Sequence, residues 1–181
     1  PTAVKAGRQS YPCDAVVVAA GAWSKKLSAQ LGHKVPLDTE RGYHVTLPNA
    51  QKRPRMPLYS GDHSFAITPL DVGLRFGGTV ELGGLEAAPN YARAQKLMNH
   101  GKRMFGELDE TGRSDWMGFR PSMPDSVPVI SQGGRFKNTY FGFGHGHIGL
   151  TLGPVTGRII ADLVAGRDPG LDMQPFRIDR F

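Results

Sequence analysis

The chain has 181 residues, of which 39% are hydrophobic and 21% charged, a composition that is ordinary for folded proteins and excludes wholesale disorder. The net charge of +6 comes from 22 basic and 16 acidic residues that are scattered along the chain, so it favours an enzyme with an anionic substrate over a nucleic-acid-binding protein. The single cysteine, Cys13, excludes an intrachain disulfide, and the longest apolar run is too short to span a membrane. These features predict a cytoplasmic protein, with a peripheral position at the inner membrane left open.

The first strong pattern is a run of small and β-branched residues at positions 15–20, which predicts a strand buried on both faces, as in a parallel sheet. Gly21 ends this strand. Residues 22–31 then predict a short helix with Trp23, Leu27 and Leu31 on one apolar face. A strand, a tight turn and a helix in this order are typical of a nucleotide site, although Trp23 could equally anchor its helix in a core.

Residues 35–85 follow a different pattern. Tyr43, Val45 and Leu47 alternate with polar residues, as do the apolar residues at 65–67 and 74–76, and turn-forming residues separate these runs. The alternation predicts an antiparallel meander of about four strands.

The second half of the chain predicts two helices and three strands. Residues 90–108 indicate a helix that Asn90 can cap. Short strands are expected near 116–121, 127–130 and 139–143, and a final helix runs to about Ala165, where Gly166 and Pro169 favour its end.

A glycine-rich turn at residues 144–149 has the form G-x-G-x-x-G and lies between a strand and a helix. As a nicotinamide-dinucleotide fingerprint it would need a βαβαβ run after it, and too few residues follow. The turn still places backbone N–H groups and a helix N-terminus where negative charge or electron-rich oxygen is favoured, as at the pyrimidine edge of a flavin. A plain turn without a ligand is the alternative. His145 and His147 have no third ligand at a recognisable spacing, so no metal site is expected.

Several motifs then occur in an order that resembles the D-amino-acid oxidase/dehydrogenase family of FAD-dependent oxidoreductases, and most of all bacterial D-amino-acid dehydrogenases. They are Ala-Ala-Gly-Ala-Trp-Ser at 19–24, Arg-Gly-Tyr-His-Val at 41–45, Gly-Gly-Thr-Val-Glu at 77–81, Gly-Phe-Arg-Pro at 118–121 and the segment from Gly144 to Pro154. The resemblance covers essentially the whole chain.

The resemblance implies an α+β fold: an antiparallel substrate-domain sheet with flanking helices, plus the C-terminal remnant of a Rossmann-like FAD domain. Residues 1–34 and 136–181 would belong to the FAD-binding domain and residues 35–135 to the substrate-binding domain. In the family the adenine and pyrophosphate site lies in an N-terminal βαβ unit. This segment is missing from the sequence, so the isolated chain is expected to bind FAD weakly or not at all and to be inactive.

The resemblance also assigns roles to individual residues. Arg120 resembles the clamp for the substrate carboxylate, a role that suits the two parallel hydrogen bonds of a guanidinium. Tyr43 and His44 point to opposite faces of their strand, so at most one should face the substrate. Tyr43 is the one expected to do so, with a tyrosine packed within the strand as the open alternative. His147 is expected to reach the substrate as well. The residues expected to bind the cofactor are Ala20, Gly21, Ala22, Trp23, Gly42, Gly144, His145, Gly146, His147, Ile148, Gly149, Leu150 and Thr151.

The implied reaction is the oxidation of a D-amino acid or a related secondary amine by hydride transfer to flavin, giving an imine that hydrolyses to an oxo acid. The electron acceptor, a quinone or oxygen, stays open. The alternatives are a non-catalytic piece without cofactor and a nicotinamide-binding protein that uses the turn at 144–149.

Overall fold

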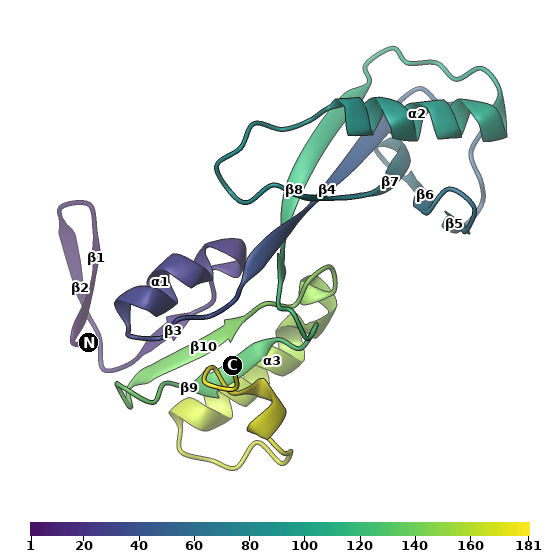
Figure 1. Ribbon diagram of the computed structural model, residues 1–181. Helices are drawn as coiled ribbons and strands as arrows, with labels where there is room; N and C mark the ends of the chain where they lie inside the picture. Colours follow the sequence, from purple (N-terminus) through teal and green to yellow (C-terminus); the bar gives the residue numbers. More distant parts are fainter. The chain divides into compact units, whose positions relative to one another are not determined.

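The computed structural model describes all 181 residues and divides into two compact units. Unit 1 consists of residues 1–39 and 120–181, and unit 2 of residues 40–119. Each unit has its own sheet and its own hydrophobic core (Figure 1). The expected domain boundaries at 34/35 and 135/136 therefore differ from the boundaries of these units.

Unit 2 is built on a five-stranded sheet with the order β5-β6-β7-β4-β8. The strands are β4 (Asp38–Leu47), β5 (Leu58–Ser60), β6 (Phe65–Leu70), β7 (Gly73–Leu82) and β8 (Ser114–Ser122), of which β4 and β8 cross the division between the units. The pairs β5–β6, β6–β7 and β7–β4 are antiparallel, which confirms the predicted antiparallel sheet. Only β5, β6 and β7 form a meander, because β4 pairs with β7 instead of with β5, the next strand in the chain.

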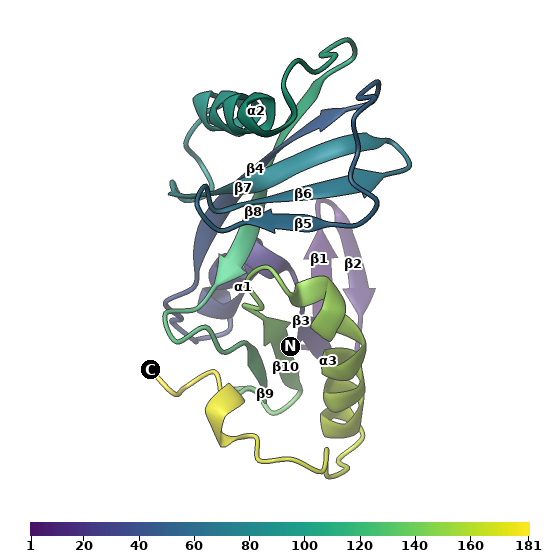
Figure 2. The ribbon, with the colours of Figure 1, turned by 90° about the vertical axis from the view of Figure 1, so that its right-hand side faces the viewer.

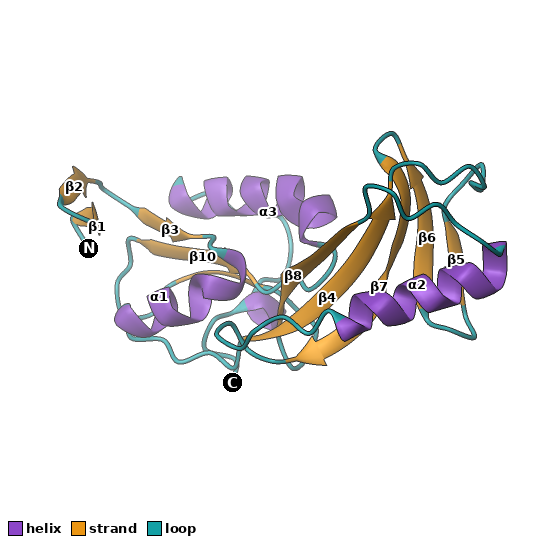
Figure 3. Ribbon diagram, turned by 90° about the horizontal axis from the view of Figure 1, so that it is seen from above, coloured by secondary structure: helices purple, strands orange, loops and turns teal.

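A single helix, α2 (Ala92–Phe105), covers one face of this sheet (Figures 2 and 3). Alternation turns Tyr43, Val45 and Leu47 of β4 to this face, where they form one buried cluster with Leu97 and Met98 of α2. The helix predicted at 90–108 is thus confirmed with shorter bounds, and Asn90 Oδ1 accepts a hydrogen bond from the Ala92 N–H at 3.2 Å.

At two positions of unit 2 a neighbouring group lies so close to the backbone that only glycine fits. A Cβ on Gly101 of α2 would lie 2.5 Å from the Phe76 ring, so the helix can pack this closely only with glycine there. Gly73 has a φ of +133°, and a Cβ there would lie 2.3 Å from the Leu47 carbonyl oxygen.

Unit 1 contains a three-stranded sheet with the order β3-β10-β9, formed by β3 (Val16–Val18), β10 (Thr139–Phe143) and β9 (Val129–Gln132). β3 and β10 are parallel, as the sequence predicts. β9 pairs antiparallel with β10. Because of this pairing the strand at 129–132 belongs to unit 1, although the sequence assigns it to the domain 35–135.

Helices α1 (Ser24–Gln30) and α3 (Gly149–Val164) lie on opposite sides of this sheet (Figure 3). Ile159 and Ile160 of α3 pack against Ile130 and Tyr140. The cluster of the other face contains Val18, Phe141 and Phe143. Unit 1 also contains a hairpin of β1 (Ala3–Ala6) and β2 (Gln9–Pro12) and the 3-10 turns η1 (Gly21–Trp23) and η2 (Gln174–Phe176).

The predicted apolar face of α1 is wrong. Trp23 is 54% exposed and Leu27 40%, whereas Ser24 and Ser28 are buried. The Ser24 hydroxyl accepts a hydrogen bond from the Ala20 N–H at 3.1 Å, which holds the serine side of the helix against the end of β3. β3 is likewise not buried on both faces, because Val17 is 45% exposed. Trp23 therefore does not anchor its helix in the core.

No helix in the structure is long and apolar enough to cross a membrane.

Candidate functional site

The candidate site of unit 1 is the edge of the sheet at which the parallel strands β3 and β10 end. Val18 and Phe141 are partners in the ladder, so the segments that follow them leave the sheet side by side. Residues 20–23 follow β3 and residues 144–151 follow β10. In open parallel sheets ligands bind at this carboxyl edge. The structure thereby brings together the residues predicted to bind a cofactor, apart from Gly42.

The turn between β10 and α3 needs its glycines. Gly144 and Gly146 have φ values of +87° and +58°, in the region that favours glycine, and a Cβ on Gly144 would lie 2.7 Å from Met123 Cγ. The Gly146 N–H donates to the Pro121 carbonyl at 2.7 Å, and an antiparallel bridge joins Ser122 to His145. These contacts tie the turn to the end of β8.

Helix α3 begins at this turn and presents its N-terminus there. The first N–H groups of a helix have no acceptor within it, and the dipole makes this end positive. Two exposed apolar side chains stand beside them, Ile148 and Leu150, the latter 96% exposed. A Cβ on Gly153 or Gly157 would meet no atom within 4 Å. This end of α3 can offer hydrogen-bond donors and apolar contact to a flat, electron-rich group.

Arg120 belongs to the same region of unit 1 and is half-buried. It directly precedes Pro121, whose carbonyl accepts the hydrogen bond from the turn. A guanidinium at this position can hold a carboxylate beside the turn.

The two histidines of the turn have different surroundings. The His145 ring lies against α3, with Nε2 3.0 Å from the Thr156 hydroxyl, and burial lowers its pKa and favours the neutral ring. His147 is exposed. No group of three or more His, Cys, Asp or Glu side chains in the chain is arranged to hold a metal ion.

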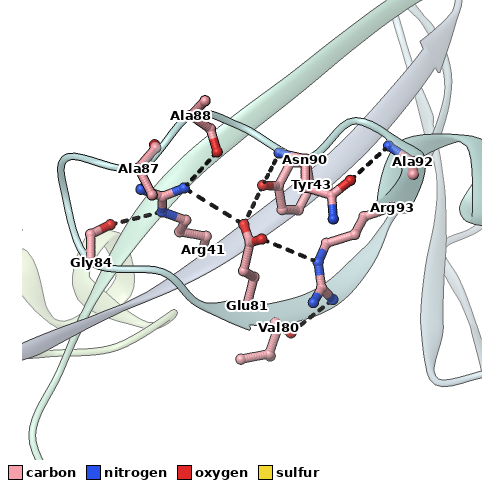
Figure 4. A network of polar contacts seen from close by, with 10 residues as sticks. All are labelled: Arg41, Tyr43, Val80, Glu81, Gly84, Ala87, Ala88, Asn90, Ala92 and Arg93. Carbon is pink, nitrogen blue, oxygen red and sulfur yellow. Dashed lines mark hydrogen bonds and ion pairs between the residues drawn. The ribbon is translucent and has the colours of Figure 1, made fainter.

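Tyr43 and Gly42 belong to unit 2. The Tyr43 ring lies in the core and is 1% exposed; its hydroxyl donates to the Glu81 carboxylate and accepts from the Asn90 N–H at 2.9 Å (Figure 4). These contacts favour a structural role for the side chain that was expected to face the substrate. Gly42 lies where the β4–β7 register shifts between Arg41 and Tyr43, with the extra residue on β7.

The same network contains a buried cation that the sequence reasoning missed. The Arg41 side chain is fully buried and donates to the carbonyls of Gly84, Ala87 and Ala88 at 2.7, 2.7 and 3.2 Å (Figure 4). Its Nη1 lies 3.7 Å from Glu81 Oε2, and its guanidinium lies 5.5 Å from the centroid of the Phe119 ring. The available signal was an arginine in the same alternation as Tyr43 and Val45, at a position that faces the core.

Comparison with known proteins places this geometry in a family. The family model described as FAD dependent oxidoreductase, abbreviated DAO, matches residues 2–163. The chain belongs to this family. Its members use FAD, so the cofactor predicted from the sequence is that of the family.

Two curated relatives illustrate the similarity. A D-amino-acid oxidase of Bradyrhizobium diazoefficiens is 44% identical over 173 residues, which are 93% of this chain and 41% of that protein. A D-amino acid dehydrogenase of Paramagnetospirillum magneticum is 34% identical over 171 residues, which are 93% of this chain and 40% of that protein. The chain thus spans about two-fifths of the length of these relatives.

Solved structures share the fold. Glycine oxidase from Geobacillus kaustophilus superposes with a TM-score of 0.79 at 22% identity, over 97% of this chain and 48% of that one. L-proline dehydrogenase from P. horikoshii gives a TM-score of 0.78 at 21% identity, over 99% of this chain and 50% of that one. The predicted α+β fold with its antiparallel sheet and flanking helices is confirmed.

The residues at the carboxyl edge of unit 1 fit part of a flavin. Gly144 and Gly146, whose positive φ values favour glycine, leave two positions of the turn without a side chain. The N-terminus of α3 supplies donors of the kind that the electron-rich pyrimidine edge accepts. By contrast, residues 165–181 form only the 3-10 turn η2, so they do not provide the βαβαβ run that a nicotinamide fingerprint at 144–149 needs.

Proposed function

We propose that these residues are the C-terminal part of an FAD-dependent enzyme that oxidises D-amino acids or related secondary amines. The observation that carries the proposal is the 44% identity to a D-amino-acid oxidase over 93% of the chain. The glycine turn, the N-terminus of α3 and Arg120, which meet in unit 1, supply the physical basis.

In this proposal Arg120 binds the substrate carboxylate. Its guanidinium forms two parallel hydrogen bonds that orient the amino acid with its Cα–H toward the cofactor. His147, the exposed histidine of the turn, lies within the same segment and contacts the substrate from the turn side. The amine reacts in its neutral form, so the chain needs no general base for the removal of the hydride.

Residues 20–23 and 144–151 would hold the isoalloxazine part of the cofactor. Bound FAD supplies the hydride acceptor, and the imine product leaves the site and hydrolyses to an oxo acid and ammonia. The N–H groups at the start of α3 would favour negative charge on the pyrimidine edge of a flavin held there. The pyrophosphate is bound by a part of the parent protein outside these residues, as the chain spans 41% of the D-amino-acid oxidase it matches.

The test uses the parent protein purified with its cofactor and mixed with D-alanine, L-alanine, D-proline or sarcosine without air. Bleaching of the flavin absorbance by a D-amino acid or by sarcosine is expected. Bleaching by L-alanine alone, or by none of the four, contradicts the proposed substrate class. Formation of peroxide in air would then indicate an oxidase, and reduction of an added quinone would indicate a dehydrogenase.

The role of Arg120 is tested by Arg120→Leu in the same parent protein. Loss of two charge-assisted hydrogen bonds predicts a fall of roughly 100-fold or more in kcat/KM. Arg167→Leu is the matched control, because this arginine is 63% exposed and pairs with Asp162 on the surface of α3. Equal kcat/KM values for both variants would contradict the assignment of Arg120 to the substrate carboxylate.

A further inference from the structure

The segment 174–181, which the proposed chemistry does not use, is bound to the loop at 123–128 within unit 1. Arg180 makes most of these contacts. Its Nε and Nη2 groups donate to the Asp125 carboxylate at 2.8 and 3.1 Å, and Nη2 also donates to the Val127 carbonyl at 2.5 Å. Hydrogen bonding from Arg180 lowers the pKa of the Asp125 carboxyl, which favours its charged form. Only 12% of the Arg180 side chain is exposed, so this pair differs from an ordinary surface ion pair.

The loop itself has a backbone conformation that needs support. Ser126 has a φ of +60°, a conformation that is unfavourable for residues other than glycine. Within the loop, the Ser126 N–H donates to the Met123 carbonyl at 3.0 Å and the Val127 N–H donates to Asp125 Oδ1 at 3.1 Å. Arg180 holds the carboxylate and the carbonyl on either side of Ser126, and thereby stabilises the loop in this conformation.

The start of this loop lies against the glycine turn. Met123 is 3% exposed, and a Cβ on Gly144 would lie 2.7 Å from its Cγ atom. The two residues before it, 121 and 122, are joined to the turn by backbone contacts. Ile178 belongs to the same buried cluster as Met123, and its N–H donates to the Ser131 hydroxyl at 3.1 Å. A shift of the loop would therefore move the residues on which the turn is packed.

We propose that Arg180 is a positioning residue for the glycine turn. By holding the loop at 123–128, it keeps Met123 against Gly144 and the turn in the conformation that would receive the flavin. The inference rests on the proposed function, because that proposal assigns the turn to the flavin. Arg180 acts through Asp125 and Met123.

The chain offers a matched control in the same segment. Arg177 also pairs with an aspartate, since its Nε and Nη2 groups donate to the Asp179 carboxylate at 2.8 and 2.6 Å. This arginine is 49% exposed, and its partner lies only two residues later in the chain. Arg177→Met therefore removes the same charge and a similar ion pair but leaves the contacts of Arg180 with the loop in place.

The first measurement is hydrogen–deuterium exchange of the parent protein, followed by mass spectrometry with FAD in excess. Arg180→Met is expected to speed exchange in the peptide that contains residues 144–149 by roughly tenfold, because the support of the turn is weakened. Arg177→Met is expected to exchange like the unchanged protein, and so are the β6 and β7 peptides of unit 2 in both variants. Unchanged exchange at 144–149, or faster exchange of equal size in unit 2, overturns the positioning role.

The second measurement is the affinity of the parent protein for FAD, from the quenching of flavin fluorescence. Arg180→Met and Asp125→Asn are each expected to raise the Kd by roughly tenfold, and the double variant is expected to add little, since both remove one contact. Additive losses in the double variant would show that Arg180 does not act through Asp125. Asp125→Asn changes the loop by one charge alone, so it tests the proposal even if Arg180→Met fails to fold.

The two proposals fail in different experiments. Failure of the proposed function appears in the unchanged parent protein, as a flavin that its amino-acid substrates do not bleach. Failure of the positioning role appears only in the comparison of the Arg180 and Arg177 variants.

Discussion

The two units of the chain differ in how far their polar groups are paired and their apolar side chains are covered. In unit 2 the buried charge of Arg41 is matched by three carbonyls and Glu81, and the apolar face of the sheet is covered by α2. In unit 1 large apolar side chains, among them Trp23, Ile148 and Leu150, stay exposed beside the segments that follow β3 and β10. The face of the unit 2 sheet under α2 is thus closed by contacts within the unit, whereas the carboxyl edge of the unit 1 sheet presents a surface suited to a ligand.

The largest effect on stability is expected when the buried charge of unit 2 is removed. Arg41→Met leaves three carbonyls without their donor and removes the ion pair with Glu81, and we expect it to lower the free energy of unfolding by about 3–5 kcal/mol. Urea unfolding followed by circular dichroism measures the change. Arg55→Met, at an exposed position, is the control and is expected to unfold like the unchanged chain. If the two variants had similar stabilities, the Arg41 contacts would not hold the segment at 84–88 together.

Glycines in the two long helices give a paired test. A Cβ on Gly101 of α2 would lie 2.5 Å from the Phe76 ring, so Gly101→Ala is expected to destabilise the chain by about 1–3 kcal/mol. A Cβ on Gly157 of α3 meets nothing within 4 Å, so Gly157→Ala is expected to stabilise it by about 0.5–1 kcal/mol through helix propensity. Thermal unfolding of both variants checks the signs. If both variants changed the stability in the same direction, the free space around each glycine would not determine the effect of the substitution.

A smaller effect is expected at the hydroxyl of Tyr43. Tyr43→Phe keeps the ring in the core but removes the hydrogen bonds to Glu81 and to the Asn90 N–H, which predicts a loss of about 1–2 kcal/mol in urea unfolding. Tyr59→Phe serves as the control, because Tyr59 is 71% exposed. A Tyr43→Phe variant as stable as the control would count against the structural role.

The strands of the antiparallel sheet and both long helices could be predicted because their patterns are local, whereas the pairing of β4 with β7 could not. Tyr43, Val45 and Leu47 alternate over one strand, and α2 shows its apolar face within its own residues. The role of Arg41 could not be predicted, since its acceptors lie 43 to 47 residues later in the chain. The predicted apolar face of α1 was wrong for a related reason. The buried Ser24 accepts a hydrogen bond from the end of β3, and a pattern of apolar residues contains no information about such a bond.

The site shows the same limit. The glycine turn was visible as a motif, and its positive φ values at Gly144 and Gly146 follow from the residue type. Its placement beside residues 20–23 depends on the parallel pairing of β3 with β10, which are separated by more than 100 residues of sequence. The roles of Arg120 and His147 came from the family resemblance, and they stay predictions.

The smallest expected effect concerns the pH dependence of unit 1. Burial lowers the pKa of His145 below its ordinary value of 6.5, so the fold favours the neutral ring. The contribution of this ring to stability is complete above pH 6.5 and is lost as the pH falls from that unfolded-state value through the lower folded-state value. We expect the His145 signal in a proton–carbon NMR titration to change below pH 6.5. We also expect His145→Gln to lose less thermal stability than the unchanged chain when the pH falls from about 7.5 to about 5.5.

Unit 2 supplies the comparison for this titration, because burial also lowers the pKa values of His44 and His100. These two histidines keep their contribution in His145→Gln, so the variant is expected to retain part of the pH dependence. A His44→Gln, His100→Gln variant removes that part and isolates the contribution of unit 1. If its remaining pH dependence did not shrink further on adding His145→Gln, burial of His145 would not favour the neutral ring, and the pH dependence expected for unit 1 would be wrong.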